Sequence, residues 1–475
     1  MNLTSQLTRF DRLIFILLVL SAPSMVYADT GDILSRFQFY GTAQETYDSN
    51  VNLSPKRDRE SDTITNTGLG LRFSTLPRSE TTGEFQPPST TRETRYGIYL
   101  DFLPSYVYYA RGTSDNYVSL SGNMDAWYTW DKNLTFRVKD YLIRSEEPLE
   151  QNYSSSALPG QILLGSQTGR PIYLRNVTQP SLEYRFGEGD IVSVNLLNNV
   201  YKNRSPLFEN SMENSINPKV TYWLNIRHGV SLEYALDLGD LQRSPDTTAN
   251  LGRGRYIYRF DPTTSVFAEY TFQRREFEKQ VFNPALDYDI HVPAVGFEYG
   301  FSPTLSLTGK FGYFWQIVPG QIIEKDKKGN IVLTLIGSNE GGPVYDIVIK
   351  QRTQKTTYTL GFQGGYTEDY FTAQNLGFAK YNQVVGTITH QLMERFAVTL
   401  SGRYQRPKFS EGRVDNLWGL TTAGSYRILR WLTLGPELSY TGNHSTKVHW
   451  AENQSNGPAN DYTDFRGIFR VTATY

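Results

Sequence analysis

Two histidines near the end of the chain are the residues whose type and spacing come closest to a catalytic or metal site. His444 and His449 lie five positions apart in the segment HSTKVH, and Asp461 and Asp464 follow them. Imidazole and carboxylate groups together can bind a metal ion or activate water for hydrolysis. A spacing of five in a polar loop fixes no ligand geometry, so a solvated loop is the favoured interpretation and a rim hydrolase the least favoured.

The other patterns that carry chemistry are weak. The chain has no cysteine, which excludes disulfides, thiolate metal sites and a cysteine nucleophile. No serine stands in a motif with a histidine base and an orienting acid. The glycine pairs at 252–254 and 364–365 do not open helices, as phosphate loops do. We therefore expect no enzymatic activity and no cofactor or metal.

Charged and aromatic residues at alternate positions could instead act on a passing solute. They share one face of segments whose other face is apolar, so in a closed sheet they would line the lumen. Asp125 is expected to oppose Arg137 and Lys139, so cross-strand pairing is as good an interpretation as a selectivity filter. The candidate lumen-lining residues are Asp125, Trp127, Arg137, Lys139, Glu183, Arg185, Lys219, Trp223, Lys310 and Arg403.

The elements that must position these residues are β-strands. Apolar and polar side chains alternate through segments such as 118–130, 305–317 and 418–428, with one face suited to lipid and the other to water. The mean hydropathy of −0.45 is compatible with this, because a spanning strand needs apolar residues only at every second position. The 33 tyrosines and 7 tryptophans also favour a bilayer interface.

The connections between these segments separate a membrane barrel from a soluble sandwich. Tight turns, such as those at 130–133 and 261–264, alternate with long polar loops, such as those at 148–171 and 319–343. The sequence predicts an all-β fold, a transmembrane antiparallel up-and-down β-barrel of about 20 strands, with about 18 as the alternative. The long loops would be extracellular and the short turns periplasmic.

The strand positions follow from the alternation. Strands in one direction are expected to start near residues 36, 94, 133, 190, 229, 264, 304, 356, 395 and 431. Returning strands are expected near residues 62, 116, 172, 213, 253, 286, 344, 379, 413 and 461. The return strand of the first hairpin and the segment at 344–349 are the two that could lie outside the wall.

A proline pattern repeats along the chain at spacings close to multiples of one hairpin. Proline, an apolar residue and an aromatic residue occupy alternate positions beginning at Pro104, Pro180, Pro218, Pro293 and Pro436. Proline lacks the N–H group that a sheet ladder requires and is normally confined to edges or bulges. We therefore expect a β-bulge near each of these prolines.

The first residues have the layout of a secretory signal peptide. Arg9 and Arg12 precede the apolar run at 13–20, and small residues lead to a cleavage site after Ala28. The expected organisation is therefore a cleaved signal peptide at 1–28 and a single outer-membrane barrel domain at 29–475. About eight residues separate Ala28 from the first strand-like run, so we expect no plug, periplasmic or passenger domain.

The last strand carries the pattern of an insertion signal. Phe469, Val471, Ala473 and Tyr475 alternate on one face, and the aromatic Tyr475 ends the sequence. This resembles the terminal signal that the bacterial barrel-insertion machinery recognises by strand pairing. The expected location is the bacterial outer membrane, reached through the periplasm.

Several phrases resemble the β-barrel porins found with bacterial exopolysaccharide and exosortase loci. They are the segment at 47–51 (YDSNV) followed by 61–64 (SDTI), the run at 370–378 (YFTAQNLGF) and the turn at 391–395 (QLMER). The resemblance spans nearly all of residues 37–475, and its motifs are moderately specific. The chain departs from the pattern in the insertion at 75–92 and the lysine-bearing loop at 324–330. The resemblance implies an outer-membrane pore that serves polysaccharide export, without an active site to transfer.

The leading functional hypothesis is an outer-membrane pore for exopolysaccharide export or passive solute diffusion. The alternatives are a non-conducting scaffold or adhesin whose loops bind glycans and, last, the rim hydrolase. Outer-membrane lipid, the barrel-insertion machinery and polysaccharide or export-complex components are the expected partners. The net charge of −1 gives no field that would attract nucleic acid, which we do not expect as a partner.

Overall fold

The computed structural model describes twelve stretches of the chain. They are residues 35–76, 95–112, 115–146, 171–206, 208–279, 285–319, 321–325, 331–337, 339–371, 377–410, 412–446 and 461–475. The expected signal peptide, most of the insertion at 75–92 and His449 lie outside these residues.

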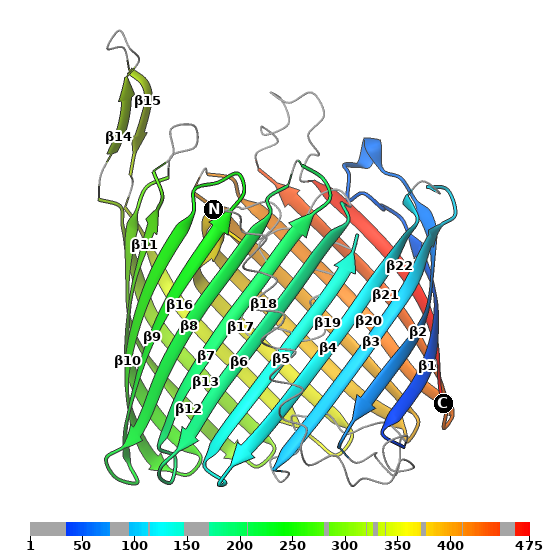
Figure 1. Ribbon diagram of the computed structural model, residues 1–475, viewed down its shortest axis with the longest axis horizontal. Helices are drawn as coiled ribbons and strands as arrows, with labels where there is room; N and C mark the ends of the chain where they lie inside the picture. Colours follow the sequence, from blue (N-terminus) through cyan, green and yellow to red (C-terminus); the bar gives the residue numbers. More distant parts are fainter. Residues whose placement is uncertain are drawn as a thin grey trace.

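Twenty of the strands form one closed antiparallel sheet (Figure 1). Each wall strand pairs with its neighbours along the chain, and β1 closes the barrel by pairing with β22. The first ten wall strands are β1 (Phe37–Asp48), β2 (Asp62–Ser74), β3 (Tyr96–Tyr109), β4 (Tyr117–Trp130), β5 (Leu134–Ser145), β6 (Tyr173–Arg185), β7 (Ile191–Asn203), β8 (Ser211–Trp223), β9 (His228–Leu241) and β10 (Thr247–Asp261). The others are β11 (Thr264–Phe277), β12 (Tyr288–Ser302), β13 (Leu305–Ile317), β16 (Glu340–Arg352), β17 (Thr356–Asp369), β18 (Gly377–Met393), β19 (Phe396–Phe409), β20 (Asp415–Leu429), β21 (Leu432–Ser445) and β22 (Tyr462–Thr474).

The expected barrel and strand count are confirmed, and the alternative of 18 strands is wrong. Both uncertain segments belong to the wall, as β2 and β16. The largest displacement is in β10, which starts at Thr247 rather than near 253, because residues 247–252 already pair within the sheet. The loop expected at 319–343 contains a further hairpin of β14 (Gln321–Lys325) and β15 (Ile331–Ile336), which rises above the rim in Figure 1.

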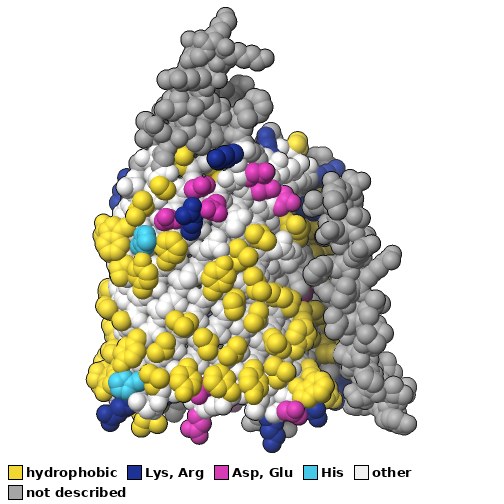
Figure 2. Space-filling model, turned by 60° about the vertical axis from the view of Figure 1, so that its left-hand side comes forward, with side chains coloured by type: hydrophobic (Ala, Val, Ile, Leu, Met, Phe, Trp, Pro, Cys, Tyr) yellow, Lys and Arg dark blue, Asp and Glu magenta, His cyan; other side chains and the backbone are white. Residues whose placement is uncertain are grey.

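Outward-facing side chains give the barrel a lipid-compatible surface. Leu69, Val295 and Leu232 are 79%, 60% and 55% exposed on the outer wall. Figure 2 shows hydrophobic side chains covering the wall, with charged groups gathered above and below them. Exposed aromatic residues follow the short-turn rim at Trp130, Tyr184, Tyr222, Tyr256, Tyr299, Tyr358, Tyr426 and Trp431. A second group follows the long-loop side at Tyr47, Tyr106, Tyr108, Tyr270, Tyr313, Trp315, Tyr404 and Tyr440.

Such a wall places the chain across a membrane. A closed sheet satisfies its own backbone hydrogen bonds, and two aromatic girdles around an apolar band match the two interfaces of a bilayer. The protein is therefore a transmembrane β-barrel of the outer-membrane type. Among the residues described, no helix is long and apolar enough to cross a membrane.

The repeated prolines interrupt the sheet without bulging it. Pro293 keeps its pairing with Tyr270 on β11, but on the β13 side pairing stops at His291 and resumes at Ala294 in the same register. The other four prolines show the same one-sided interruption. The expected bulges are therefore wrong. Proline loses a ladder bond to one neighbour only, so no extra residue is needed.

A polar cluster at the long-loop rim joins the first strand to the last. Ser49 Oγ donates to Asp464 Oδ1 at 3.1 Å and accepts from the Phe465 amide at 2.7 Å. Arg466 Nε lies 3.1 Å from Asp48 Oδ2, and both side chains are buried. We call the place where β1 pairs with β22, with its polar cluster, the seam. The phrase YDSN therefore lies at the seam.

The proline interruptions generate a stability prediction at Gly312, which lies beside Pro293. A Cβ atom there would lie 2.4 Å from the Pro293 carbonyl oxygen and 2.8 Å from the Ala294 Cβ. Gly312→Ala should therefore lower the free energy of unfolding by about 1–3 kcal/mol, through overpacking. Urea unfolding followed by heat-modifiable gel migration measures this.

Gly252→Ala is the matched control, because a Cβ at Gly252 meets no atom within 4 Å. Equal stability of the two variants would contradict the tight packing at Gly312.

Candidate functional site

The candidate lumen residues on β4 and β5 lie together on the inner face of the wall. Arg137 Nε donates to Asp125 Oδ1 at 2.6 Å, and its guanidinium lies 5.5 Å from the centre of the Trp127 ring. Lys139 is directly opposite Asp125 in the register, yet Arg137 forms the ion pair. Trp127 is buried against Gly97 on β3.

The other candidates are distributed around the barrel rather than gathered in one site. Arg185 and Glu183 form an ion pair of 2.7 Å along β6. The Arg259 guanidinium lies 3.9 Å from the centre of the Trp223 ring. Arg403 extends over Gly419 on β20, where an added Cβ would lie 3.3 Å from its Nε. Lys219 lies directly opposite Glu233 across the β8–β9 pair. A role for these residues in permeation stays a prediction.

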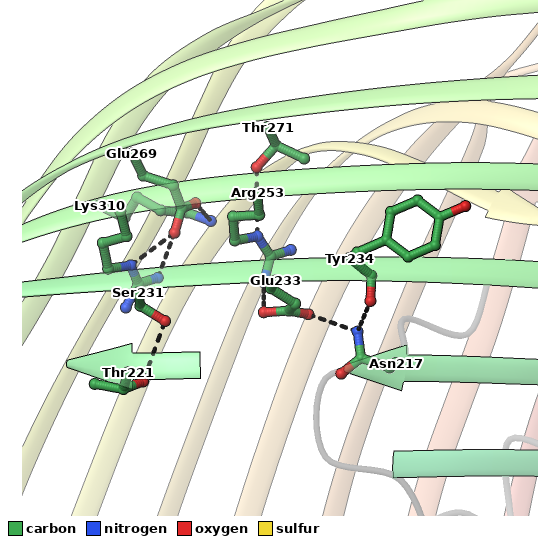
Figure 3. A network of polar contacts seen from close by, with 10 residues as sticks. Asn217, Thr221, Ser231, Glu233, Tyr234, Arg253, Glu269, Thr271 and Lys310 are labelled. Atoms are coloured by element: carbon green, nitrogen blue, oxygen red, sulfur yellow. Dashed lines mark hydrogen bonds and ion pairs between the residues drawn. The ribbon is translucent and has the colours of Figure 1, made fainter. Parts of the chain in front are cut away.

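Polar contacts connect β8 to β13 across the inner wall (Figure 3). Glu233 accepts from Asn217 Nδ2 at 3.0 Å and lies 3.4 Å from Arg253 Nη1. Arg253 Nε also reaches Thr271 Oγ1, at 3.4 Å. Acidic and basic groups thus neutralise one another locally along this part of the wall.

Glu269 on β11 lies at the end of the same network. It accepts from Arg255 Nε at 2.8 Å and lies 3.6 Å from Lys310 Nζ. Lys310 reaches it across β12, where the residue paired with Lys310 is Gly296, which has no side chain to intervene. One nearly buried carboxylate therefore balances two cations, so the field here depends strongly on Glu269.

The outer end of β17 departs from the wall and enters the lumen. Pairing of β17 with β16 ends at Gly364, whereas its pairing with β18 continues to Asp369. Tyr358 and Leu360 face outward, but Tyr366, in the same alternation, packs 5.1 Å from the buried Phe314 ring on β13. Gly365 has a φ of +151°, which favours glycine at the bend. We call residues 365–371 and 377–380 the tucked segment.

An ion pair anchors the tucked segment to β11. Arg275 Nη2 and Nε donate to the two carboxylate oxygens of Glu368 at 2.8 and 3.1 Å, with side-chain exposures of 5% and 13%. Gln273 Nε2 adds a bond of 2.6 Å to Glu368, and the Tyr288 hydroxyl also donates to it. The anchor is bidentate and desolvated, the geometry in which an arginine–carboxylate pair is strongest.

Aromatic rings fill the space behind this anchor. Phe378 packs 6.0 Å from Phe314 and 5.7 Å from Tyr366, measured between ring centres. The Tyr370 hydroxyl lies 3.0 Å from that of Tyr288. Burial and the nearby negative charge of Glu368 raise the pKa of the Tyr370 phenol, so it stays a neutral hydrogen-bonding group.

The tucked segment reaches far around the inside of the barrel. Phe371 contacts β9 at Gly239, where an added Cβ would lie 2.5 Å from its ring. The segment therefore leaves the wall at β16 and crosses the inner faces of β13 to β10. Such an arrangement narrows the lumen near the long-loop rim.

Sequence reasoning missed the anchor, although parts of it were visible. Gly364 and Gly365, whose pairing in the sequence resembles a phosphate loop only weakly, form the bend. The run at 370–378 carries part of the family resemblance, and its described residues Tyr370, Phe371, Gly377 and Phe378 belong to the tucked segment. Arg275 and Glu368 lie on strands that are not neighbours in the sheet, and no local sequence pattern pairs them.

The histidine site receives little support from the structure. His444 is 74% exposed and lies 3.4 Å from Asp461, and His449 lies outside the described residues. Where the structure describes the chain, no group of three histidine, aspartate or glutamate side chains could hold a metal ion.

Comparisons with known proteins find similarity only to solved structures, and this similarity is distant. No family model and no curated protein matches the chain. Among solved structures, the FrpB iron transporter from Neisseria meningitidis (F5-1 variant) has a TM-score of 0.47 at 8% identity, covering 94% of this chain and 84% of that one. OccAB4 from Acinetobacter baumannii has 0.41 at 11%, covering 93% and 98%. The outer membrane protein opdK from Pseudomonas aeruginosa has 0.40 at 7%, covering 92% and 99%. At these values the likeness supports no inference about ligands.

Removing one partner of the anchor should destabilise the barrel. Arg275→Ala leaves the Glu368 carboxylate buried without its cation, which should cost about 3–5 kcal/mol of unfolding free energy. Urea titration of the purified protein in detergent measures the loss.

Arg274→Ala is the control on the neighbouring residue. Arg274 faces outward and pairs with Glu276, with both side chains about half exposed. Its removal should leave stability unchanged. An equal loss in both variants would contradict a special role for the inner pair.

Proposed function

We propose that this protein is a passive diffusion pore of the outer membrane whose narrowest part is bounded by the tucked segment. The observation that carries the proposal is the anchored inward course of residues 365–371, held by Arg275 and Glu368. A buried bidentate ion pair fixes this strand end inside the lumen, whereas a strand end that stayed at the rim would not require one.

The size of the barrel supports a water-filled passage. Small barrels of about 8 strands are filled by their own side chains, whereas barrels of about 16–18 strands leave an aqueous channel. A wall of 20 strands is wider still. The inner face supplies ionic and amide groups that suit water and polar solutes.

Charge pairing supports weak rather than strong ion selectivity. Arg137 with Asp125, and Arg253 with Glu233, form local pairs on the inner wall, so opposite charges offset one another at these positions. Solutes would then be sorted mainly by size at the tucked segment.

The same proposal covers partners and cargo. Lipid would contact the apolar band, and the insertion machinery would recognise the last strand through Phe469, Val471, Ala473 and Tyr475, whose backbone amide bonds Phe39 at 2.8 Å. Exopolysaccharide export remains a prediction from the sequence resemblance. The Trp127 ring contacts the Arg137 guanidinium, and the Trp223 ring contacts that of Arg259. A sugar that stacked on either ring would have to displace this contact. We propose no catalytic role.

Single-channel recordings test the pore and its narrowing. Wild-type protein in planar bilayers should give conductance steps. Arg275→Gln combined with Glu368→Gln removes the charges of the anchor without leaving either partner unpaired, and should give a larger unitary conductance with more noise. Absence of steps at every voltage would contradict a pore.

The control is Arg274→Gln combined with Glu276→Gln, the outward pair on the same strand. It should conduct like the wild type. If both double variants conduct like the wild type, the tucked segment does not set the conductance.

Glu269 generates a separate prediction about selectivity. Glu269→Gln leaves Arg255 and Lys310 without their shared carboxylate, so the reversal potential in a KCl gradient should shift towards chloride. Glu276→Gln, on the outer face of β11, should leave the reversal potential unchanged. A shift towards potassium in Glu269→Gln would refute the assigned lumen field.

A further inference from the structure

One part of the lipid-facing wall carries outward polar residues on four consecutive strands, whereas outward Thr67 and Thr422 elsewhere stand between apolar or aromatic partners. On β5 to β8 the outward residues Asp140, Thr178, Asn198 and Asn214 are direct cross-strand partners of one another in sequence. They face outward because they alternate with inner residues such as Arg137 and the buried Asn199 and share the face of the exposed Leu182 and Leu196. We call this row, with Asn176, the polar row.

Three members of the polar row lie near the middle of their strands, and Asn176 and Asn214, each the fourth of 13 residues, lie nearer the long-loop rim. Asp140 is the seventh of 12 residues in β5, Thr178 the sixth of 13 in β6 and Asn198 the eighth of 13 in β7. At comparable positions from the short-turn end elsewhere, the outward residues include Val295, Phe311 and Leu438, each more than a third exposed. Lipid tails cannot hydrogen-bond the amides and the carboxylate at this depth.

The outer aromatic girdle is also interrupted over the same strands. Tyr106 and Tyr108 carry it on β3, and Tyr270 carries it on β11. In the outer halves of β4 to β8, all of which the structure describes, no outward residue is aromatic. Aromatic girdles mark contact with the lipid interface, so their absence here indicates a face covered by something else.

We propose that the polar row is the contact of this barrel with a second copy of the same chain. Two copies in one membrane hold the same residue at the same depth, so the row of one copy meets the row of the other. Carboxamides are self-complementary because each has a donor and an acceptor. Polar side chains of this kind associate transmembrane segments.

The hydrogen bonds within the row favour an identical partner over a charged one. Asp140 already accepts from Asn176 Nδ2 at 3.1 Å and from Thr178 Oγ1 at 2.5 Å, so it requires no cation from outside. Asn198 Nδ2 donates to Asn214 Oδ1 at 2.8 Å. This leaves the Asn198 oxygen of one copy to accept a hydrogen bond from the Asn214 amino group of the other copy across a two-fold axis.

Cross-linking tests the contact directly, because the chain has no cysteine and a single introduced one is its only thiol. In outer-membrane vesicles carrying Asn198→Cys, a flexible bis-maleimide should give a product of twice the chain mass. Val295→Cys, outward on β12 and 60% exposed, should give none. Equal cross-linking at both sites, or a product of Asn198→Cys with a different polypeptide, overturns the proposal.

The mass of the purified protein gives an independent readout. In mild detergent the wild type should contain more than one chain. Asn198→Leu combined with Asn214→Leu should raise the concentration for dissociation at least tenfold, with heat-modifiable migration and unitary conductance kept as signs of folding. A single-chain wild type, or an assembly that this variant does not weaken, overturns the proposal.

Discussion

Backbone hydrogen bonding in a medium without water is the constraint on which the rest of this structure depends. Each wall strand must be paired on both sides, so the sheet can end only by meeting its own beginning. The seam meets this demand where β1 and β22 pair, and its buried polar groups satisfy the strand ends. The one-sided interruptions at the prolines are tolerated because pairing continues on their other side.

Closure of the sheet satisfies the backbone hydrogen bonds, so the two faces of the wall differ only in their side chains. Outward side chains contact lipid, whereas inward side chains contact water and one another. The tucked segment changes this assignment locally. Beyond Gly364, residues in the outward alternation pack on the inner wall, since the strand has left the sheet on the β16 side. A family phrase, a glycine pair and an aromatic cluster thus have a single physical explanation.

Most of the fold could be predicted from the alternation of apolar and polar residues, because this alternation depends on the sequence of each strand alone. It predicted all the wall strands, although it placed the start of β10 near 253 rather than at Thr247. Contacts such as that of Arg275 with Glu368, 93 residues apart, depend on where a strand leaves the sheet, and no local pattern encodes that. The β14–β15 hairpin was missed because a short apolar pair resembles a loop with scattered hydrophobic residues. The alternation also gave no sign that Asp140 and Asn198 belong to a polar row. It predicts which face of the sheet a residue occupies, but not how deep in the membrane it lies.

The seam has a consequence for the order in which the barrel is built. Ser49 and Asp464 are 415 positions apart, so their contact is among the most non-local in the chain. Bringing distant segments together costs loop-closure entropy that is recovered only when they pair, which makes such contacts slow. Hairpins along the wall can form from neighbours, whereas the seam must wait until both ends have been assembled. During that interval β1 and β22 are open edges, and the molecule is most exposed to pairing with the wrong strand.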